Sequence, residues 1–491
     1  MRYRNVSKIH PFIVAVFYTL DKIVIFLGLV LVVRILEPKD LGIAELAQVF
    51  IGVFVIGKFT VFHHALVYNK ETSDEIYNAG FTADFVLSLL FYIGIFISAP
   101  FWADFYKTAV LVNLIRVVGL SIILESLLVV PLARLEKNLK FNVIYKFYFF
   151  ISLFRLSLMV MLALKGFSYW SIIWSHFVSV LFSVFLFNLY EPGKARFNID
   201  IVLFKKLFAY GKYVFIINLS VFILKNISGL FIGKMLGVAM LGFFLVAYKW
   251  GFWIMNNIFA PLDRILFPLY AKYREKNDIL KKIFLKSLRY SSVFALFISV
   301  GLFLIAGEFV HVLLGDKWRA AVTPLKVLCI AGLIEFFGSL SYTYLRAAGF
   351  IKIESTRRIV YSILLCALSY PMINAYGLLG ASWALLIATT ITQSLYTIYI
   401  IRKMRLTFRE IFKDLYIPLI SVTCMMMSMG LMKIFVLNRL CIKGFLELAY
   451  LALVEFSVYA ALIALFMGKE AALLLRAMSK QSANIDEILT I

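Results

Sequence analysis

Apolar runs of about twenty residues follow one another along almost the whole chain, separated by short polar segments. A helix needs about 20 predominantly apolar residues to cross the hydrocarbon core of a membrane. By this criterion the pattern predicts about fourteen membrane-spanning helices between residues 11 and 467. The narrowest division is between the eleventh and twelfth spans, where only Asn374, Tyr376 and Gly377 mark a turn. The expected fold class is an all-α polytopic membrane protein.

Composition supports this class. Hydrophobic residues make up 63% of the chain, charged residues make up 16%, and the mean hydropathy is +0.93. Soluble chains carry about 25% charged residues, so a water-soluble globule is excluded. The first apolar run, from Pro11 to Val33, is too long for the hydrophobic part of a signal peptide and lacks a small-residue cleavage site. It is therefore expected to stay in the protein as a span.

Basic residues collect in alternate loops, which explains the net charge of +23 without nucleic acid. The basic loops hold Arg134, Lys137, Lys140 and Lys146; Lys194, Arg196, Lys205 and Lys206; Lys272, Arg274, Lys276, Lys281, Lys282 and Lys286; Lys352, Arg357 and Arg358; and Arg402, Lys403, Arg405, Arg409 and Lys413. Cytoplasmic loops of membrane proteins are enriched in Lys and Arg. The pattern predicts that both termini are cytoplasmic, and the loop at 67–78 is a weak exception.

The chain is expected to consist of two pseudo-repeated bundles around a central cavity. The predicted parts are an N-terminal six-helix bundle (1–189), a cytoplasmic linker (190–207), a C-terminal six-helix bundle (208–401), two additional spans (402–467) and a cytoplasmic tail (468–491). Arg34-Ile35-Leu36 with Leu41-Gly42 matches Lys234-Met235-Leu236 with Leu241-Gly242, at an offset of 200 residues. Leu132-Ala133-Arg134 and Leu345-Arg346-Ala347 form a second echo. Six helices return the chain to the same side, so the repeat is parallel.

Basic residues inside the apolar runs are the main candidates for a binding site. They are Lys22, Lys58, Arg116, Arg155, Lys225, Lys249 and Arg264. A Lys or Arg at mid-bilayer costs about 2.5–3.5 kcal/mol, so such residues usually face a watery cavity or a partner. These cations outnumber the intramembrane carboxylates. They are therefore expected to line the cavity and to hold phosphate or acidic sugar groups.

Two successive spans carry polar stripes with residues seven apart, which fall on nearly the same helix face. The stripes contain Gly211, Asn218 and Lys225 in the seventh span and Gly242, Lys249, Asn256 and Asp263 in the eighth. Tight helix packing through small and polar residues is an alternative explanation. It accounts for the glycines but poorly for two central lysines. In the first span Asp21 points about 100° away from Lys22 and is not expected to pair with it.

Three intramembrane carboxylates are candidates for binding a coupling ion, H⁺ or Na⁺: Asp84, Glu45 and Glu335. The alternative is that they only neutralise neighbouring cations. In the tenth span, Glu335, Ser339, Tyr342 and Arg346 align on one helix face. The four cysteines, Cys329, Cys366, Cys424 and Cys441, are isolated and are expected to be small packing residues.

Several local motifs occur in an order and spacing that resembles a known family. They are Arg34-Ile35-Leu36-Glu37-Pro38-Lys39-Asp40-Leu41-Gly42, the segment Pro131 to Phe141, Phe267-Pro268-Leu269-Tyr270, Leu314-Gly315-Asp316-Lys317-Trp318 and Tyr376-Gly377-Leu378-Leu379-Gly380-Ala381. The chain resembles the polysaccharide (Wzx-type) flippases of the multidrug/oligosaccharidyl-lipid/polysaccharide exporter superfamily. One departure is Gly237-Val238-Ala239, which replaces a Pro-Lys-Asp type of turn in the second half and is expected to affect loop shape only.

The resemblance implies a two-lobed transporter in the bacterial cytoplasmic (inner) membrane. Its cargo would be undecaprenyl-diphosphate-linked oligosaccharide repeat units for surface polysaccharide, which is O-antigen, capsule or exopolysaccharide. The resemblance also implies alternating access driven by an ion gradient or the membrane potential. Expected partners are the lipid-linked oligosaccharide, membrane lipids and the coupling ion, with a polysaccharide polymerase as a further candidate.

Three other functions remain open at this stage. A multidrug or ion antiporter of the same superfamily usually moves cationic cargo, which would favour buried carboxylates over buried lysines. A peptidoglycan-precursor flippase is not excluded by charge. A membrane polysaccharide polymerase would need acid, base or metal-binding groups in a sizeable outer loop. The outer loops are short, and His63, His64, His176 and His311 show no metal-ligand spacing. No enzyme activity, nucleotide, metal or other cofactor is therefore expected.

Overall fold

A computed structural model describes residues 11–68, 73–192, 196–198, 200, 222, 226–253, 257, 259–434 and 444–479. Every regular element in these ranges is a helix, which confirms the expected fold class. The chain forms two compact units, residues 1–242 and 243–491. The predicted division by a linker at 190–207 stays a prediction.

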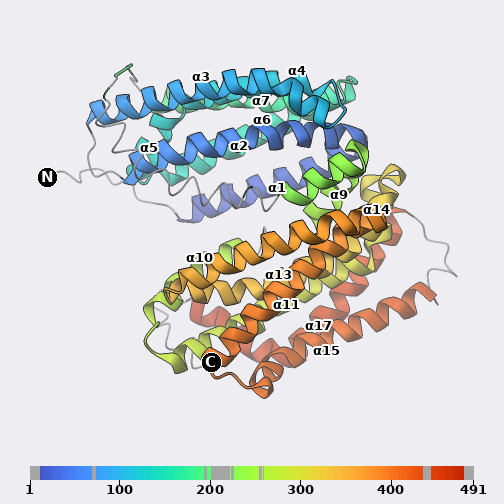
Figure 1. The fold of residues 1–491 in the computed structure, drawn as a ribbon. Helices are drawn as coiled ribbons and strands as arrows, with labels where there is room; N and C mark the ends of the chain where they lie inside the picture. Colours follow the sequence, from blue (N-terminus) through green and yellow to red (C-terminus); the bar gives the residue numbers. More distant parts are fainter. Residues whose placement is uncertain are drawn as a thin grey trace. The chain divides into compact units, whose positions relative to one another are not determined.

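The first unit is a bundle of long apolar helices that run beside one another (Figure 1). Its helices are α1 (Pro11–Ile35), α2 (Pro38–Tyr68), α3 (Asp74–Phe105), α4 (Leu111–Ser126), α5 (Val129–Lys137), α6 (Phe141–Leu164) and α7 (Tyr169–Tyr190). Helix α1 packs along α6, α3 along α4, and α6 along α7. Buried clusters fill the spaces between them, such as Phe62, Leu66, Tyr77 and Phe81 between α2 and α3.

The turn between α1 and α2 is closed by the side chain of Asp40. The backbone N–H of Glu37 donates to Asp40 Oδ2 (3.1 Å), and the hydroxyl of Ser168 donates to Asp40 Oδ1. Pro38 at the first position of α2 has no N–H to lose there, which suits a helix start. The Glu37-Pro38-Lys39-Asp40 motif therefore has a structural role at a helix start.

The two echo segments contact each other within the first unit. A Cβ atom built on Gly42 would lie 1.8 Å from the carbonyl oxygen of Val238, and one built on Gly242 would lie 1.9 Å from the carbonyl oxygen of Pro38. No side chain fits at either position, because real Cβ atoms essentially never come that close to another atom. The two segments that are similar in sequence therefore also contact each other, backbone against backbone, at the starts of α2 and α9 (Val238–Gly251).

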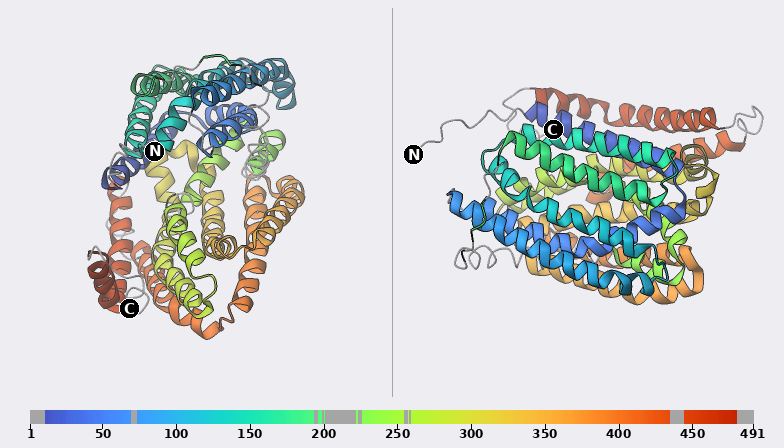
Figure 2. Two further views of the ribbon diagram at one scale, coloured as in Figure 1. Left: turned by 90° about the vertical axis from the view of Figure 1, so that its left-hand side faces the viewer. Right: turned by 90° about the horizontal axis from the view of Figure 1, so that it is seen from above.

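The second unit contains the remaining helices, shown from two further directions in Figure 2. They are α10 (Ala260–Lys272), α11 (Asn277–Leu304), α12 (Ala306–Phe309), a π-helix (Val310–Leu314), a 3₁₀-helix (Asp316–Ala321), α13 (Val322–Ala347), α14 (Ile351–Lys403), α15 (Phe408–Met432) and α17 (Phe445–Ser479). Helix α13 packs against α10, α11 and α14, and α15 packs against α11 and α17. Helix α13 is therefore the centre of this unit.

Local chemistry explains two helix boundaries in the second unit. Helix α15 starts with a capping box, in which Thr407 N–H donates to Glu410 Oε2 (2.8 Å) and Glu410 N–H donates to Thr407 Oγ1 (3.4 Å). Helix α14 is two helices joined at Gly377, whose φ of 57° and ψ of −134° are not helical. Side chains are strained at such angles, so glycine suits this turn. This confirms the predicted break between the eleventh and twelfth spans.

The described part of the chain contains nine helices long and apolar enough to cross a membrane. They become ten when α4 and α5, which are bent by 46° relative to each other, count as one span. The protein is a multi-pass membrane protein, and the count of fourteen spans stays a prediction. The apolar pattern of residues 108–132 did not lead us to expect this bend, although Pro131 in the first turn of α5 lacks the N–H that would otherwise bond the carbonyl of Leu127.

Candidate functional site

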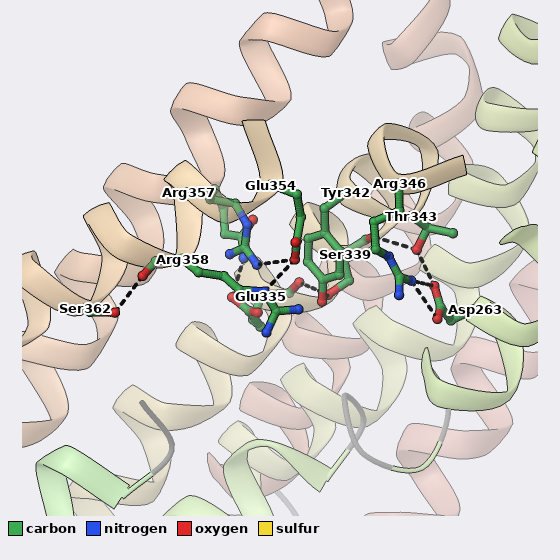
Figure 3. Close-up of polar contacts among 11 residues, drawn as sticks. Asp263, Glu335, Ser339, Tyr342, Thr343, Arg346, Glu354, Arg357, Arg358 and Ser362 are labelled. Atoms are coloured by element: carbon green, nitrogen blue, oxygen red, sulfur yellow. Dashed lines mark hydrogen bonds and ion pairs between the residues drawn. The ribbon is translucent and has the colours of Figure 1, made fainter. Parts of the chain in front are cut away.

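A polar stripe on α13 forms the centre of the candidate site (Figure 3). Glu335, Ser339, Tyr342 and Arg346 lie three or four residues apart, so they share one face of the helix. The hydroxyl of Ser339 donates to the backbone carbonyl of Glu335 (2.6 Å) and lies 2.5 Å from the hydroxyl of Tyr342. The predicted alignment is confirmed.

Glu335 is half-buried and has a partner on α14. The side-chain amide of Gln393, which is 2% exposed, donates to Glu335 Oε2. Gly338 makes this contact possible, because a Cβ atom at that position would lie 2.0 Å from Gln393 Oε1. The other half of the Gln393 amide, Oε1, accepts no hydrogen bond from any group in the described ranges. The site therefore presents a carboxylate beside an unused amide oxygen.

Three tyrosines surround Glu335: Tyr248 of α9, Tyr342 of α13 and Tyr361 of α14. Each lies close enough for electrostatic interaction with its carboxylate. Helix α9 approaches α13 closely where Gly332 faces Gly251, since a Cβ atom on Gly332 would lie 2.3 Å from the carbonyl oxygen of Gly251. The glycine contact places Tyr248 near the carboxylate. Helices α9, α13 and α14 thus each place a tyrosine within electrostatic range of one half-buried acid.

Arg357, in the second turn of α14, lies beside the tyrosines. Its guanidinium stands 4.5 Å from the ring centroid of Tyr342, and the residue is 5% exposed. Glu354 Oε1 accepts a hydrogen bond from Arg358 Nε (2.6 Å) and lies 3.9 Å from Arg357 Nη2. The sequence placed Arg357 and Arg358 in a cytoplasmic loop. They lie instead on a helix, and Arg357 is buried.

The stripe ends in an ion pair between α13 and α10. Arg346 Nη2 donates to both carboxylate oxygens of Asp263, at 2.6 and 2.8 Å, and Thr343 donates to the same carboxylate. The whole cluster of Figure 3 contains three acids and three guanidiniums, and is therefore charge-balanced. Asp263 was predicted as part of a polar stripe with Lys249, and here its partner is an arginine of another helix.

In the first unit the polar groups meet between α1 and α6. The Ser152 hydroxyl donates to Asp21 Oδ1 (2.5 Å), and Lys22 Nζ lies 3.9 Å from Asp21 Oδ2. The prediction that Asp21 and Lys22 do not pair is wrong, because the flexible lysine chain bends back over the backbone. Arg155 follows Ser152 by three residues on the same face of α6 and interacts with His176 of α7.

The other predicted cations in the described ranges do not form a cluster with these groups. Arg116 of α4 stacks on Phe96 of α3, with 3.9 Å between its guanidinium carbon and the ring centroid. Lys249 and Arg264 are exposed on the second unit. Whether they line a cavity stays a prediction.

The remaining predicted residues divide into two groups. Among the candidate carboxylates, Asp84 is fully buried in α3 and Glu45 is half-buried in α2. Lys225, Asn218, Asn256 and the side chain of Lys58 lie outside the described residues. Their part in a site stays a prediction.

Sequence reasoning missed Gln393, Tyr248, Tyr361 and Arg357. A signal for Gln393 was present, because a lone amide inside the long apolar run 377–401 is costly without a hydrogen-bond partner. Tyrosines are common at membrane interfaces, so the sequence alone does not reveal that three of them are buried around one acid. In the described part of the chain, no group of three His, Cys, Asp or Glu side chains is arranged to hold a metal ion.

The apolar helices and buried polar clusters described above are those of a multi-pass membrane protein. Residues 31–323 match the model of the family "Polysaccharide biosynthesis protein". Because the match covers more than half of the chain, the protein belongs to this family.

Curated relatives carry related names. The chain is similar to the teichuronic acid biosynthesis protein TuaB of Bacillus subtilis, at 22% identity over 59% of this chain and 60% of that protein. It is similar to the lipopolysaccharide biosynthesis protein WzxC of Escherichia coli, at 21% identity over 81% and 82%. It is also similar to the succinoglycan biosynthesis transport protein ExoT of Rhizobium meliloti, at 22% identity over 73% and 76%. The match spans less than two thirds of TuaB and more than two thirds of the other two proteins.

Solved structures share the fold. The lipid II flippase MurJ in an inward closed conformation superposes with a TM-score of 0.70 and 15% identity, covering 93% of this chain and all of that one. An inward-facing multidrug-resistance transporter of the MATE family superposes with a TM-score of 0.63 and 14% identity, covering 79% and 94%. The chain thus shares the fold of these two solved structures.

Proposed function

We propose that this protein is a flippase that moves undecaprenyl-diphosphate-linked oligosaccharide repeat units across the bacterial cytoplasmic membrane. The product would be a surface polysaccharide: O-antigen, capsule or exopolysaccharide. The observation that carries the proposal is the family match over residues 31–323. Relatives named for lipopolysaccharide biosynthesis and for succinoglycan transport support it.

A diphosphate is the part of this cargo that resists crossing hydrocarbon, so it needs cationic partners on its way. The proposed partners are the intramembrane cations of both units: Lys22, Lys58, Arg116, Arg155, Lys225, Lys249 and Arg264. Lysine ammonium groups bind phosphate as mobile point charges and release it readily, whereas arginine offers a planar fork of donors. Exposed Lys249 and Arg264 are free of any ion pair in the described ranges, which leaves them available for cargo.

Ion-coupled alternating access is the proposed driving mechanism. Of the three candidate acids, Glu335 has the surroundings best suited to a cation, because its partner Gln393 keeps an amide oxygen without a donor in the described ranges and three tyrosines lie within electrostatic range of its carboxylate. Each charge that crosses 100 mV of membrane potential contributes about 2.3 kcal/mol. We assign Glu335 the coupling role, with H⁺ or Na⁺ as the ion.

Glycan analysis of a deletion strain tests the function. Loss of the gene should remove the surface polysaccharide and leave lipid-linked repeat units on the cytoplasmic side of the membrane. Complementation with the wild-type gene is the control. Normal polymer with altered drug resistance would identify an antiporter instead. Stranded peptidoglycan precursor would identify a flippase for that lipid, and stranded repeat units on the outer side would indicate a polymerase.

A further inference from the structure

Glu455 lies in the middle of α17 and is 3% exposed. It follows the start of that helix by ten residues, which is about 15 Å along the axis. Its Oε1 atom accepts no hydrogen bond from any described residue. None of the polar stripes expected from the sequence includes it, and it does not belong to the Glu335 cluster.

The packing of α17 against α11 leaves a recess for this carboxyl group. A Cβ atom at Gly301 of α11 would lie 3.1 Å from Glu455 Oε2, so a larger residue there would press on the acid. Leu296 of α11, Val422 and Met425 of α15, and Tyr459 of α17 form the buried apolar cluster of this region. The Tyr459 hydroxyl donates to the carbonyl of Val293 (2.8 Å) and is therefore already used.

Two charged groups face Glu455 from neighbouring elements. They are Lys433 at the end of α15 and Glu308 of α12. These two already form an ion pair with 2.6 Å between Lys433 Nζ and Glu308 Oε1, and Lys433 also donates to the carbonyl of Leu304 (3.0 Å). One ammonium group therefore serves two carboxylates. Lys433 therefore compensates only part of the negative charge that an ionised Glu455 would carry.

A buried carboxylate without a donor or a free counter-ion is costly, and binding a proton removes that cost. A metal cation would need several oxygen ligands, and no group of three His, Cys, Asp or Glu side chains that could hold one occurs in the described residues. We propose that Glu455 is a proton-binding site. It holds a proton while α17 is packed against Gly301, and it releases the proton when water or a donor reaches the carboxyl group.

The position of the Lys433–Glu308 pair indicates from which side of the membrane a proton would reach Glu455. Both side chains are partly exposed, at 35% and 22%, while Glu455 is covered. The predicted topology places this end of α15 and α17 on the outer side of the membrane. Protons from the outer side would then reach Glu455 past the pair. The expected effect of Glu455 on transport rests on the proposed ion-coupled function, whereas proton binding by Glu455 does not.

Infrared difference spectroscopy on the full-length protein in lipid nanodiscs tests proton binding directly. Between neutral and alkaline pH, the wild type should lose a protonated-carboxyl C=O band that Glu455→Gln lacks at every pH. Glu447→Gln, two turns earlier on the same helix, should keep the band. The proposal is overturned if the band persists in Glu455→Gln, or if the wild type shows no pH-dependent band that this substitution removes. Glutamine matches glutamate in shape and mimics the neutral acid, so folding should be preserved.

A transport assay separates this proposal from the proposed function. In proteoliposomes with an imposed membrane potential of about 100 mV and lipid-linked oligosaccharide, Glu455→Gln should lose the bias of about fiftyfold that this potential imposes on one proton charge, whereas Glu447→Gln should retain it. If the wild type moves no lipid-linked oligosaccharide, the proposed function fails while the infrared result stands. If Glu455→Gln keeps the full gradient response, the site has no part in coupling and that consequence is wrong.

Discussion

At the scale of single residues, Glu335 illustrates how a half-buried acid can be prepared for a cation. Its carboxylate accepts a hydrogen bond from Gln393, and the remaining amide oxygen of Gln393 has no donor in the described ranges. A cation bound here would gain a carboxylate oxygen and an amide oxygen together, and Tyr342 and Tyr361 lie within electrostatic range of the carboxylate. A neutral amide in place of the acid would remove the charge but keep the shape.

We therefore expect Glu335→Gln to lower gradient-driven transport by about tenfold or more, because it deletes the charge that couples to the ion. Exchange of cargo at equal ion concentrations should change little. Proteoliposome transport with and without an imposed gradient measures both rates. Glu354→Gln is unsuited as a control because it breaks a buried salt bridge. Glu275→Gln serves instead, because its ion pair with Arg274 is exposed to solvent and contributes little. Equal loss of driven transport and of exchange would assign Glu335 a structural role.

At the scale of elements, the contact between α13 and α14 depends on the lack of a side chain at Gly338. Gly338 leaves the space that Gln393 fills, and the Ser341 and Thr397 hydroxyls meet farther along the same two helices at 3.4 Å. Helix α14 itself reverses at Gly377, which returns its second half along α13. The position of Gln393 is thus set by a turn sixteen residues earlier in the chain.

Replacing Gly338 with alanine should destabilise the second unit by about 1–3 kcal/mol, because the added methyl group overpacks the Gln393 side chain. Thermal unfolding in detergent measures the change. Gly430→Ala is the matched control, since Gly430 is also helical and a Cβ atom there would meet nothing within 4 Å. That variant should be neutral or slightly stabilised. Equal melting temperatures for the two variants would contradict the account of the Gly338 contact.

The apolar runs predict the helices, but they do not predict which helices pack against one another. The sequence predicted the break at Gly377 and the alignment of Glu335, Ser339, Tyr342 and Arg346, because both depend on residues near one another in the chain. The pairing of Arg346 with Asp263 joins residues 83 positions apart, and helical periodicity carries no information about which helices become neighbours. The bend between α4 and α5, in contrast, has a local signal, because Pro131 lacks the N–H that would bond the carbonyl of Leu127.

At the scale of the whole molecule, the transport proposal depends on cations that the cargo can reach. Lys249 is exposed on α9, and its counterpart in the seventh predicted span, Lys225, lies outside the described residues. Polar stripes in two successive spans place each lysine near the middle of a predicted span. A diphosphate that passes both would exchange one ammonium partner for another.

We expect the double variant Lys225→Ala, Lys249→Ala to reduce polysaccharide export while protein abundance in the membrane stays unchanged. The reason is that loss of two cations weakens the hold on the diphosphate without breaking an ion pair of Lys249. Export is measured as surface glycan and abundance by immunoblotting. Lys413→Ala, an exposed cation of α15, should export normally. Wild-type export by the double variant would remove these lysines from the mechanism.

The reciprocal contact of Gly42 with Val238 and of Gly242 with Pro38 has a consequence for how this molecule can evolve. If the two halves arose by duplication of one ancestral segment, each copy inherited the bare backbone that the other copy presses against. A methyl group gained by either copy would then push the shared joint apart, and the surviving glycine could not compensate. Because backbone atoms occupy both places, neither position can gain a side chain, and a change at one cannot make room for a change at the other.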